Sequence, residues 1–380
     1  MNQIEKLLEE LCPNGVEYKL LGEVGNVFRG KRFVKADITE SGIPCIHYGE
    51  IYTRYGISAE ESFSFVSVER AKSLRFAAPG DVIMATSGET VADIGKSVAW
   101  LGNEPVVIHD ACYVISSPMN SKFLSYFFAS SGFRDQIKQK ISSSKISSIS
   151  VRNVSKTAIP VPPLEVQRVI VEILDKFTEL EAELEAELEA RKKQYGHYRA
   201  DLLELPNVPL VSLTQIVESI SSGRNKSRVQ DGKFPVFGST GKIGTTNEYN
   251  YSGDSLLIAR VGANAGMVNV ASGCYDVSDN TLIIKPNYGW DIRFAFHQLT
   301  RMNLNQYAVG GGQPLLTGKR LKELMVPLPS LDEQRGIATV LDRFDELVND
   351  LSAGLPAEIA ARHKQYEYYR DQLLSLREVE

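Results

Sequence analysis

An internal repeat constrains the fold of this 380-residue chain more than any other feature of its sequence. The segment IPVPPLEVQRVIVEILDKFTEL at 159–180 recurs as VPLPSLDEQRGIATVLDRFDEL at 326–347, an offset of 167 residues. The segment KKQYGHYRADLL at 192–203 recurs as HKQYEYYRDQLL at 363–374, an offset of 171 residues. The whole chain is therefore a duplication, and we expect its two halves to share one fold.

Each half contains a helical part and a part of mixed composition. Residues 161–205 and 326–380 carry apolar residues three or four apart, which is the spacing of a coiled-coil seam. The other segments are rich in Gly, Ser and Asn and contain short apolar runs, which predict α+β globules with long loops. The sequence thus predicts an α+β fold in which two globules are separated by two long antiparallel coiled-coil helices, with an internal pseudo-two-fold. The predicted domains are an N-terminal helix at 1–12, a first globule at 13–160, a helical spacer at 161–205, a second globule at 206–325 and a second helical spacer at 326–380.

The repeat also predicts where the chain ends lie and where a helix breaks. Residues 11–24 resemble residues 205–217, so the N-terminal helix matches the end of the first spacer. We expect that helix to pack with the C-terminal helix, which brings the two ends of the chain together. The sequence Gly354-Leu355-Pro356 should break or restart the second spacer, because Pro356 has no N–H for a helical hydrogen bond.

The charge distribution leaves nucleic acid among the candidate partners. The chain has a formal net charge of −5, and each helical spacer alone has a net charge of −5. The globules at 13–160 and 206–325 are basic, with net charges of +3 and +4. Neutralising DNA phosphates requires local positive charge, which the globules have.

Several functional classes find no support in the sequence. No run of about 18 apolar residues is present to span a membrane, and the N-terminal segment lacks the apolar region of a secretory signal. We therefore expect a cytoplasmic protein whose four cysteines are free thiols. The five histidines form no closely spaced ligand set, so no metal site is expected. Gly95-Lys96-Ser97 is not the end of a P-loop, because Thr90 stands where the first glycine should be. We find no catalytic constellation and expect no enzymatic activity.

The duplicated signature resembles a known family. Each copy has a proline-rich start, then Glu/Asp-x-Gln-Arg-x-Ile, and ends in Lys-Gln-Tyr-x-x-Tyr-Arg-x-x-Leu-Leu. This pattern resembles the specificity (S) subunit of type I restriction-modification enzymes, over essentially the whole chain. The resemblance implies that 13–160 and 206–325 are target-recognition domains, each reading one half of a bipartite DNA target, and that the helices set the spacer between the halves.

The resemblance also implies the partners. They are double-stranded DNA, two methyltransferase (modification) subunits and restriction/translocase subunits, with no membrane involved. The S subunit of that family has no catalysis and no cofactor of its own, because S-adenosylmethionine, ATP and Mg are used by the partner subunits. A different hypothesis stays open: the chain is a non-catalytic coiled-coil adaptor that joins two proteins without binding DNA.

Candidate DNA-binding residues are the Lys and Arg that can neutralise phosphates and the polar or aromatic side chains that can contact base edges. In the first globule they are Arg29, Lys31, Arg32, Tyr48, Arg54, Tyr55, Thr86, Ser87 and Lys145. In the second globule they are Arg224, Asn225, Lys226, Arg228, Arg260, Asn264, Gln313 and Lys319. The repeated Gln-Arg pair predicts partner docking at Gln167, Arg168, Gln334 and Arg335. No catalytic residue and no metal ligand is predicted.

The first spacer contains the unit ELEA three times, from Glu179 to Ala190. One such tetrad adds about 6 Å of helical rise and a net rotation of about 40° beyond one turn. One DNA base pair adds about 3.4 Å and roughly 35°. Because the two rotations nearly agree, the tetrads predict a helical ruler between the two reading domains. The alternative is that Glu, Leu and Ala simply form a stable helix with a solvated acidic face.

Overall fold

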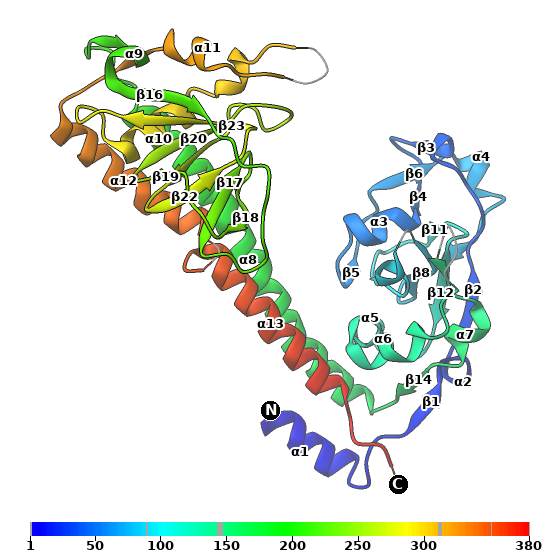
Figure 1. The fold of residues 1–380 in the computed structure, drawn as a ribbon. Helices are drawn as coiled ribbons and strands as arrows, with labels where there is room; N and C mark the ends of the chain where they lie inside the picture. Colours follow the sequence, from blue (N-terminus) through cyan, green and yellow to red (C-terminus); the bar gives the residue numbers. More distant parts are fainter. Residues whose placement is uncertain (1, 89, 143–146, 311–313, 351, 380) are drawn as a thin grey trace. The chain divides into compact units, whose positions relative to one another are not determined.

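The computed structural model describes residues 2–88, 90–142, 147–310, 314–350 and 352–379 (Figure 1). The fold is α+β, as predicted, and it forms two compact units. Unit 1 comprises Met1–Glu183 and Ala360–Glu380, and unit 2 comprises Leu184–Ile359. Each unit therefore combines one globule with helical segments from both repeats.

The globule of unit 1 is built on two five-stranded sheets. The first has the order β2 (Asn26–Arg29), β12 (Cys112–Ser116), β8 (Val82–Ala85), β10 (Ser97–Trp100), β5 (Ser58–Ala59). The second has the order β3 (Ile38–Thr39), β6 (Ser64–Val66), β4 (Ile43–Ile46), β11 (Val106–Ile108), β7 (Phe76–Ala77). Strand β8 is buried on both faces: Val82 and Met84 pack in the core that contains helix α5 (Ser121–Ala129), and Ile83 packs in the core between the sheets.

The globule of unit 2 repeats this plan with fewer strands. Its first sheet has the order β16 (Val217–Ser222), β23 (Thr281–Pro286), β20 (Ser255–Ala259), β21 (Val268–Ala271). Its second sheet has the order β18 (Gly241–Thr246), β17 (Phe234–Gly238), β22 (Cys274–Val277), β19 (Tyr251–Ser252). Helix α10 (Ile292–Arg301) contacts β20 and β21, in the place that α5 takes in unit 1.

A glycine marks the same position in both globules. The N–H of Gly30, after β2, donates to Cys112 O at 3.0 Å, and the N–H of Gly223, after β16, donates to Thr281 O at 3.0 Å. A Cβ atom on Gly30 would lie 2.2 Å from His109 O, and a Cβ atom on Gly223 would lie 2.1 Å from Ser278 O. Only glycine permits this close approach, so the duplication preserved the residue together with the turn.

Shorter elements complete each unit. An antiparallel ribbon precedes each long helix, formed by β1 (Tyr18–Leu20) with β14 (Ala158–Pro160) and by β15 (Leu210–Ser212) with β24 (Met325–Pro327). Unit 1 also has β9 (Ser87–Gly88), β13 (Ser147–Ser148), α2 (Leu21–Val24), α3 (Tyr48–Thr53), α4 (Val68–Ala71), α6 (Ser131–Lys138) and α7 (Val151–Ser155). Unit 2 also has α9 (Leu213–Ile216) and α11 (Gly318–Lys322).

The helical spacers differ in continuity. Helix α8 (Leu164–Leu202) runs without a break through the ELEA tetrads, whose residues have high helix propensity. The second spacer is two helices, α12 (Leu331–Asn349) and α13 (Leu355–Leu374). The predicted restart at Gly354-Leu355-Pro356 is therefore confirmed, and Pro356 lies in the first turn of α13, where its missing N–H costs no helical hydrogen bond.

The start of each repeat's helix packs against the end of the other repeat's helix. In unit 1 the ring of Phe177, in α8, stacks on Tyr369 of α13 at 5.5 Å between centroids. Glu181 Oε1, one turn further along α8, lies 3.2 Å from His363 Nδ1, which is earlier in α13 than Tyr369. Helix α13 therefore runs antiparallel to α8 within this unit. In unit 2 the equivalent Phe344, in α12, stacks on Tyr198 of α8 at 5.2 Å.

The ends of the chain lie together within unit 1. The N–H of Val16 donates to Arg377 O at 2.7 Å, and the N–H of Val379 donates to Val16 O at 3.2 Å. In helix α1 (Asn2–Leu11), Ile4 is buried in the core that also contains Leu374. The chain ends therefore meet as the weak repeat at 11–24 predicts.

Candidate nucleic-acid interface

Unit 2 has a cavity of about 390 Å³ at one end of its sheets. Three of the predicted DNA-binding residues line it, namely Asn225, Lys226 and Arg228. Lys226 and Arg228 are exposed, so their charges are available to an anionic ligand. The other lining residues follow strands β17 and β22 or lie in β18, and most are polar: Ser239, Thr240, Ile243, Ser278, Asp279 and Asn280.

Backbone hydrogen bonds explain why these loops meet. The N–H groups of Arg224 and Asn225 both donate to Val277 O, at 2.9 and 2.8 Å, which holds the loop after β16 against the end of β22. The N–H of Ser278 donates to Phe237 O at 2.8 Å, which continues the parallel pairing of β22 with β17. Polar residues that follow three different strands are thereby brought to one edge.

The equivalent edge of unit 1 gathers predicted residues in the same way. The N–H of Lys31 donates to Ile108 O at 3.0 Å, the counterpart of the bond from Arg224. Lys31 and Arg32 are exposed, and Arg29 donates to the backbone and the carboxylate of Asp110 while 57% of its side chain stays exposed. The ring of Tyr48 packs against the rings of His47 and His109 at the same edge. The first globule therefore presents a basic edge where the second presents its cavity.

Two histidines lie at the unit 1 edge: His47, which precedes the candidate Tyr48 in the sequence, and His109, which the sequence does not single out. The ring centroids of His47 and His109 are 4.5 Å apart, and Tyr48 stands 4.5 Å from His47 and 5.2 Å from His109. Burial lowers the pKa of His109 to about 4, with a further contribution from His47, and burial also lowers the pKa of His47. These rings are therefore neutral at pH 7 and add no charge to the edge. Their position directly after β4 and β11 is the signal that could have selected them.

The side chains of other predicted residues of unit 1 are engaged in contacts within the globule. The guanidinium of Arg54 lies 4.3 Å from the ring centroid of Phe63, and Tyr55 Oη accepts from the Phe63 N–H at 3.1 Å. Ser87 O accepts from the hydroxyl of Tyr52. Thr86 is 3% exposed and its hydroxyl donates to Ala111 O at 3.0 Å, so the prediction that it contacts DNA is corrected: this side chain has no free surface.

The remaining predicted residues of unit 2 are spread over several loops. The N–H of Arg260 donates to Asn280 O at 2.9 Å, next to the cavity. Arg260 Nε is buried and has no hydrogen-bond partner within the described part of the chain. Asn264 is exposed in the loop between β20 and β21, and Lys319 is exposed in α11. Two further predictions, Lys145 and Gln313, fall outside the described residues.

The two glutamines predicted to dock a partner have a structural role instead. Gln167 is 2% exposed; its Oε1 accepts from the Asn120 N–H at 2.8 Å and its Nε2 donates to Pro162 O at 2.7 Å. Gln334 is fully buried, and its Oε1 accepts from the Asp291 N–H at 2.8 Å. Its Nε2 donates to Gly289 O at 3.0 Å and to Pro329 O at 2.9 Å. Both side chains join the start of a long helix to the start of the helix packed on the sheet, so neither is a surface contact.

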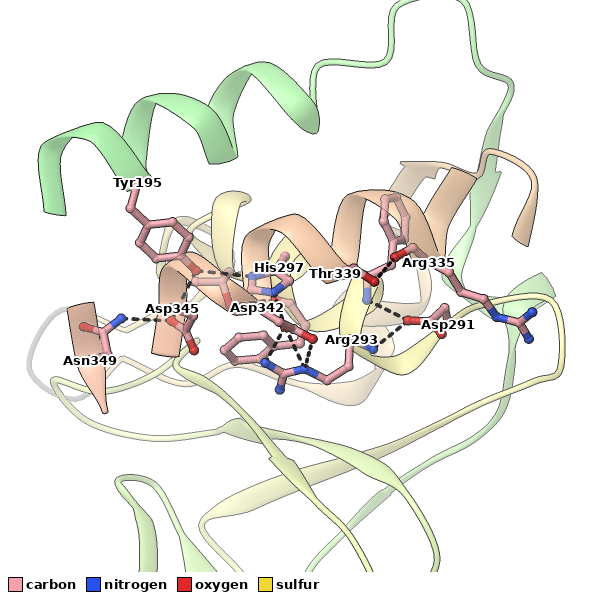
Figure 2. A network of polar contacts seen from close by, with 12 residues as sticks. Tyr195, Asp291, Arg293, His297, Arg335, Thr339, Asp342, Asp345 and Asn349 are labelled. Carbon is pink, nitrogen blue, oxygen red and sulfur yellow. Dashed lines mark hydrogen bonds and ion pairs between the residues drawn. The ribbon is translucent and has the colours of Figure 1, made fainter. Parts of the chain in front are cut away.

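The arginines of the same motif remain available. Arg168 and Arg335 are exposed, and Figure 2 shows the Arg335 side chain pointing away from the other labelled polar side chains. Of the four residues predicted to dock a partner, the two arginines are therefore accessible to one and the two glutamines are not.

A charged network ties α12 to α10 in unit 2 (Figure 2). Asp342 accepts from Arg293 Nε at 2.9 Å and Nη2 at 2.6 Å, and it lies 2.6 Å from His297 Nε2. Burial lowers the pKa of His297 and outweighs the Asp342 carboxylate, which raises it. In unit 1 the equivalent Asp175 accepts from Lys122 and from the Tyr126 hydroxyl. These charges are used within the fold and are not part of the basic edges.

Among the described residues, no three His, Cys, Asp or Glu side chains are grouped to hold a metal ion. The four cysteines are free. Over the same residues, no helix combines the length and the apolar character needed to cross a membrane.

Comparison with known proteins identifies the family. The family described as the type I restriction modification DNA specificity domain matches residues 13–190 and 208–361. The specificity subunit of the type I restriction enzyme EcoprrI from Escherichia coli is 34% identical over 252 residues, 61% of this chain and 62% of that protein. That match spans less than two thirds of the relative's length. A putative type I restriction enzyme specificity subunit from Haemophilus influenzae is 28% identical, and the match covers 98% of both chains.

Solved structures show the same fold. The S subunit of a type I restriction-modification system from M. genitalium has a TM-score of 0.58 at 15% identity, over 94% of this chain and 96% of that chain. A chain from a structure on complex assembly and conformational transition of the type I restriction-modification system has a TM-score of 0.65 at 19% identity, over 95% and 98%. The two family matches together cover most of the sequence and coincide with its two repeats, and so the chain belongs to the type I restriction-modification specificity subunits.

Proposed function

We propose that this specificity subunit recognises a bipartite DNA target, with one half-site read by each globule. The observation that carries the proposal is the pair of equivalent sheet edges, each of which gathers exposed Lys and Arg with polar or aromatic side chains. Basic side chains suit phosphates and the polar loop residues suit base edges. Because the residues at equivalent positions differ, as in Arg32 and Asn225, the two half-sites should differ in sequence.

We also propose that the chain acts as a scaffold without catalysis of its own. The duplicated helices offer two equivalent docking sites, centred on Arg168 and Arg335, for two methyltransferase subunits, to which restriction/translocase subunits are added. S-adenosylmethionine, ATP and Mg would be used by those partners, in the cytoplasm. The adaptor hypothesis shares the scaffold but lacks DNA binding, so a DNA-binding measurement separates the two.

Replacing Lys226 by Ala should weaken DNA binding by the complex with methyltransferase subunits and leave the half-site read by 13–160 unchanged. If Lys226 neutralises one phosphate, the slope of log affinity against log salt should fall by about one unit. Arg224→Ala should act similarly. Lys72→Ala is the matched control, because Lys72 is 67% exposed, pairs with Glu69 and lies in the other unit. Unchanged affinity and slope in both the Lys226 and the Arg224 variants would remove this loop from the interface. No DNA binding by the wild-type complex at low salt would favour the adaptor.

One chain should bind two methyltransferase subunits. The reason is the duplication, since a motif that docks one partner occurs twice. Native mass spectrometry of the complex at saturating partner concentration measures the stoichiometry. A mass that corresponds to one partner per chain would contradict the scaffold proposal while leaving the DNA proposal intact.

A further inference from the structure

The cavity of unit 2 contains a side chain whose orientation is held by a buried carboxylate. Asn225 Nδ2 donates to Asp276 Oδ2 at 2.7 Å. Asp276 is 3% exposed, and it also accepts from Asn250 Nδ2 at 3.2 Å and from the Val277 N–H at 2.9 Å. Asp276 therefore acts as an acceptor toward three N–H donors.

This arrangement fixes which end of the Asn225 amide is free. Turning the amide over would place Asn225 Oδ1 against Asp276 Oδ2, and two acceptors at that distance repel each other. The carboxylate thus keeps the Nδ2 end of Asn225 toward Asp276. The oxygen end must point elsewhere, as an acceptor only.

Asn225 Oδ1 is buried and has no hydrogen-bond partner among the described residues. A buried acceptor without a partner is unfavourable, so a ligand that supplies a donor gains more than an ordinary surface hydrogen bond. Asn225 lines the cavity together with Lys226 and Arg228, whose side chains are exposed. In the major groove of DNA, the hydrogen-bond donors are the amino groups N6 of adenine and N4 of cytosine.

We infer that Asn225 reads a base with an amino group in the half-site of unit 2. Asp276 is the positioning residue, because it holds Asn225 Nδ2 and so leaves Asn225 Oδ1 to accept from the base. At one strand position, unit 2 then prefers adenine or cytosine to guanine or thymine, whose groups there are carbonyl acceptors. This inference rests on the proposed DNA-binding function and specifies the chemistry of one contact.

The device belongs to unit 2 alone. The matching backbone bonds of the two edges make Lys31 equivalent to Arg224, and therefore Arg32 equivalent to Asn225. The matching parallel pairs, β11 with β4 and β22 with β17, make Val107 equivalent to Asp276. Arg32 is a donor and Val107 has no carboxylate, so unit 1 cannot present a fixed acceptor at this point.

The test measures base preference with the complete complex of this chain and its methyltransferase subunits. The probe is a pool of double-stranded DNA that carries all four base pairs at each position of both half-sites. The wild-type complex should show one position in the half-site of unit 2 that separates adenine and cytosine from guanine and thymine. Asn225→Ala should abolish that separation and lower affinity for the preferred duplexes by about fivefold to tenfold.

Asp276→Asn tests the positioning role. An asparagine at 276 can donate to Asn225 Oδ1, so the Asn225 amide can turn over and present its NH₂ group. The expected result is a loss of the adenine/cytosine preference at the same position, with all other positions unchanged. A destabilised fold would instead weaken binding to every duplex equally, and if Asp276→Asn does not fold, Asn225→Ala alone carries the test.

The outcomes separate this inference from the function on which it rests. The inference is overturned if the wild-type complex binds DNA but Asn225→Ala changes the base preference at no position. It is also overturned if a folded Asn225→Ala variant loses affinity equally for every duplex. Either result leaves the proposed DNA recognition standing. A preference for guanine or thymine at the shifted position also overturns the inference. Absence of salt-dependent DNA binding by the wild-type complex contradicts the proposed function itself.

Discussion

A variant that lacks Glu183–Ala186 should recognise the same two half-sites with a spacer about one base pair shorter. The deletion removes one tetrad from α8, which is continuous from Leu164 to Leu202. It takes away about 6 Å of rise and a net rotation of about 40°. One base pair corresponds to about 3.4 Å and roughly 35° of DNA twist. The rotations nearly agree, so the second globule should meet the duplex one base pair earlier.

The apolar stripe of α8 should survive this deletion. Leu188 moves into the place of Leu184, four residues after Leu180, so the helix keeps its spacing of apolar residues. Leu180 is 51% exposed and contributes little packing, whereas Leu188 packs against the core of unit 2. Folding of both globules should therefore be preserved, with some loss of contact along the helix.

Sequencing of the methylated sites, in the presence of the methyltransferase partner, measures the spacer. The control is the double substitution Glu183→Gln and Glu185→Gln, which changes the acidic face of the same tetrad but keeps the length of the helix. We expect the control to retain the wild-type spacer. An unaltered spacer in a fully active deletion variant would refute the helical ruler, and would favour the alternative that the tetrads only extend a stable helix.

Gln334→Ala should destabilise unit 2, and Arg335→Ala should leave its stability unchanged. Gln334 is fully buried and bonds to Asp291 N–H, Gly289 O and Pro329 O. Removing its amide leaves these groups without their partner, at a cost of about 3 kcal/mol once partial compensation is allowed for. Arg335 is exposed, so its loss should instead weaken methyltransferase binding if it lies at a docking site.

Calorimetric unfolding of the two variants, combined with titration of the methyltransferase subunit, separates the two roles. The pair is matched because the residues are neighbours in one motif. Gln167→Ala and Arg168→Ala repeat the comparison in unit 1, where Gln167 is 2% exposed. If Gln334→Ala has wild-type stability but does not bind the partner, then Gln334 contacts the partner directly and its proposed structural role is wrong.

The sequence by itself determined the fold class, the duplication and the family. These follow from periodic or local signals: apolar residues three and four apart in the spacers, the proline-rich helix starts, and the break before Pro356. The burial of the glutamines was within reach of the same reasoning. Gln167, Ile170 and Leu174 step by three and four, so the glutamine shares the apolar face of its helix, as does Gln334 with Ile337 and Leu341.

The composition of the candidate interface was decided only by the tertiary structure. Basic clusters such as Arg29 to Arg32 are visible in the sequence, but Ser278 and its neighbours lie beside Asn225 only because strands β16, β17 and β22 end at one edge. Thr86 is a polar residue that the sequence offers as a DNA contact, but in the structure it is buried and its hydroxyl donates to Ala111 O.

The sequence predicts that the two spacers pair antiparallel, but which residues meet where the helix ends pack together was decided by the tertiary structure. Phe177 meets Tyr369, and Phe344 meets Tyr198, through contacts that are remote in the sequence. A repeat shows that two segments are alike, but it does not say which copy packs on which. That choice depends on which apolar faces the folded chain can bury together, and helix periodicity marks those faces without naming their partners.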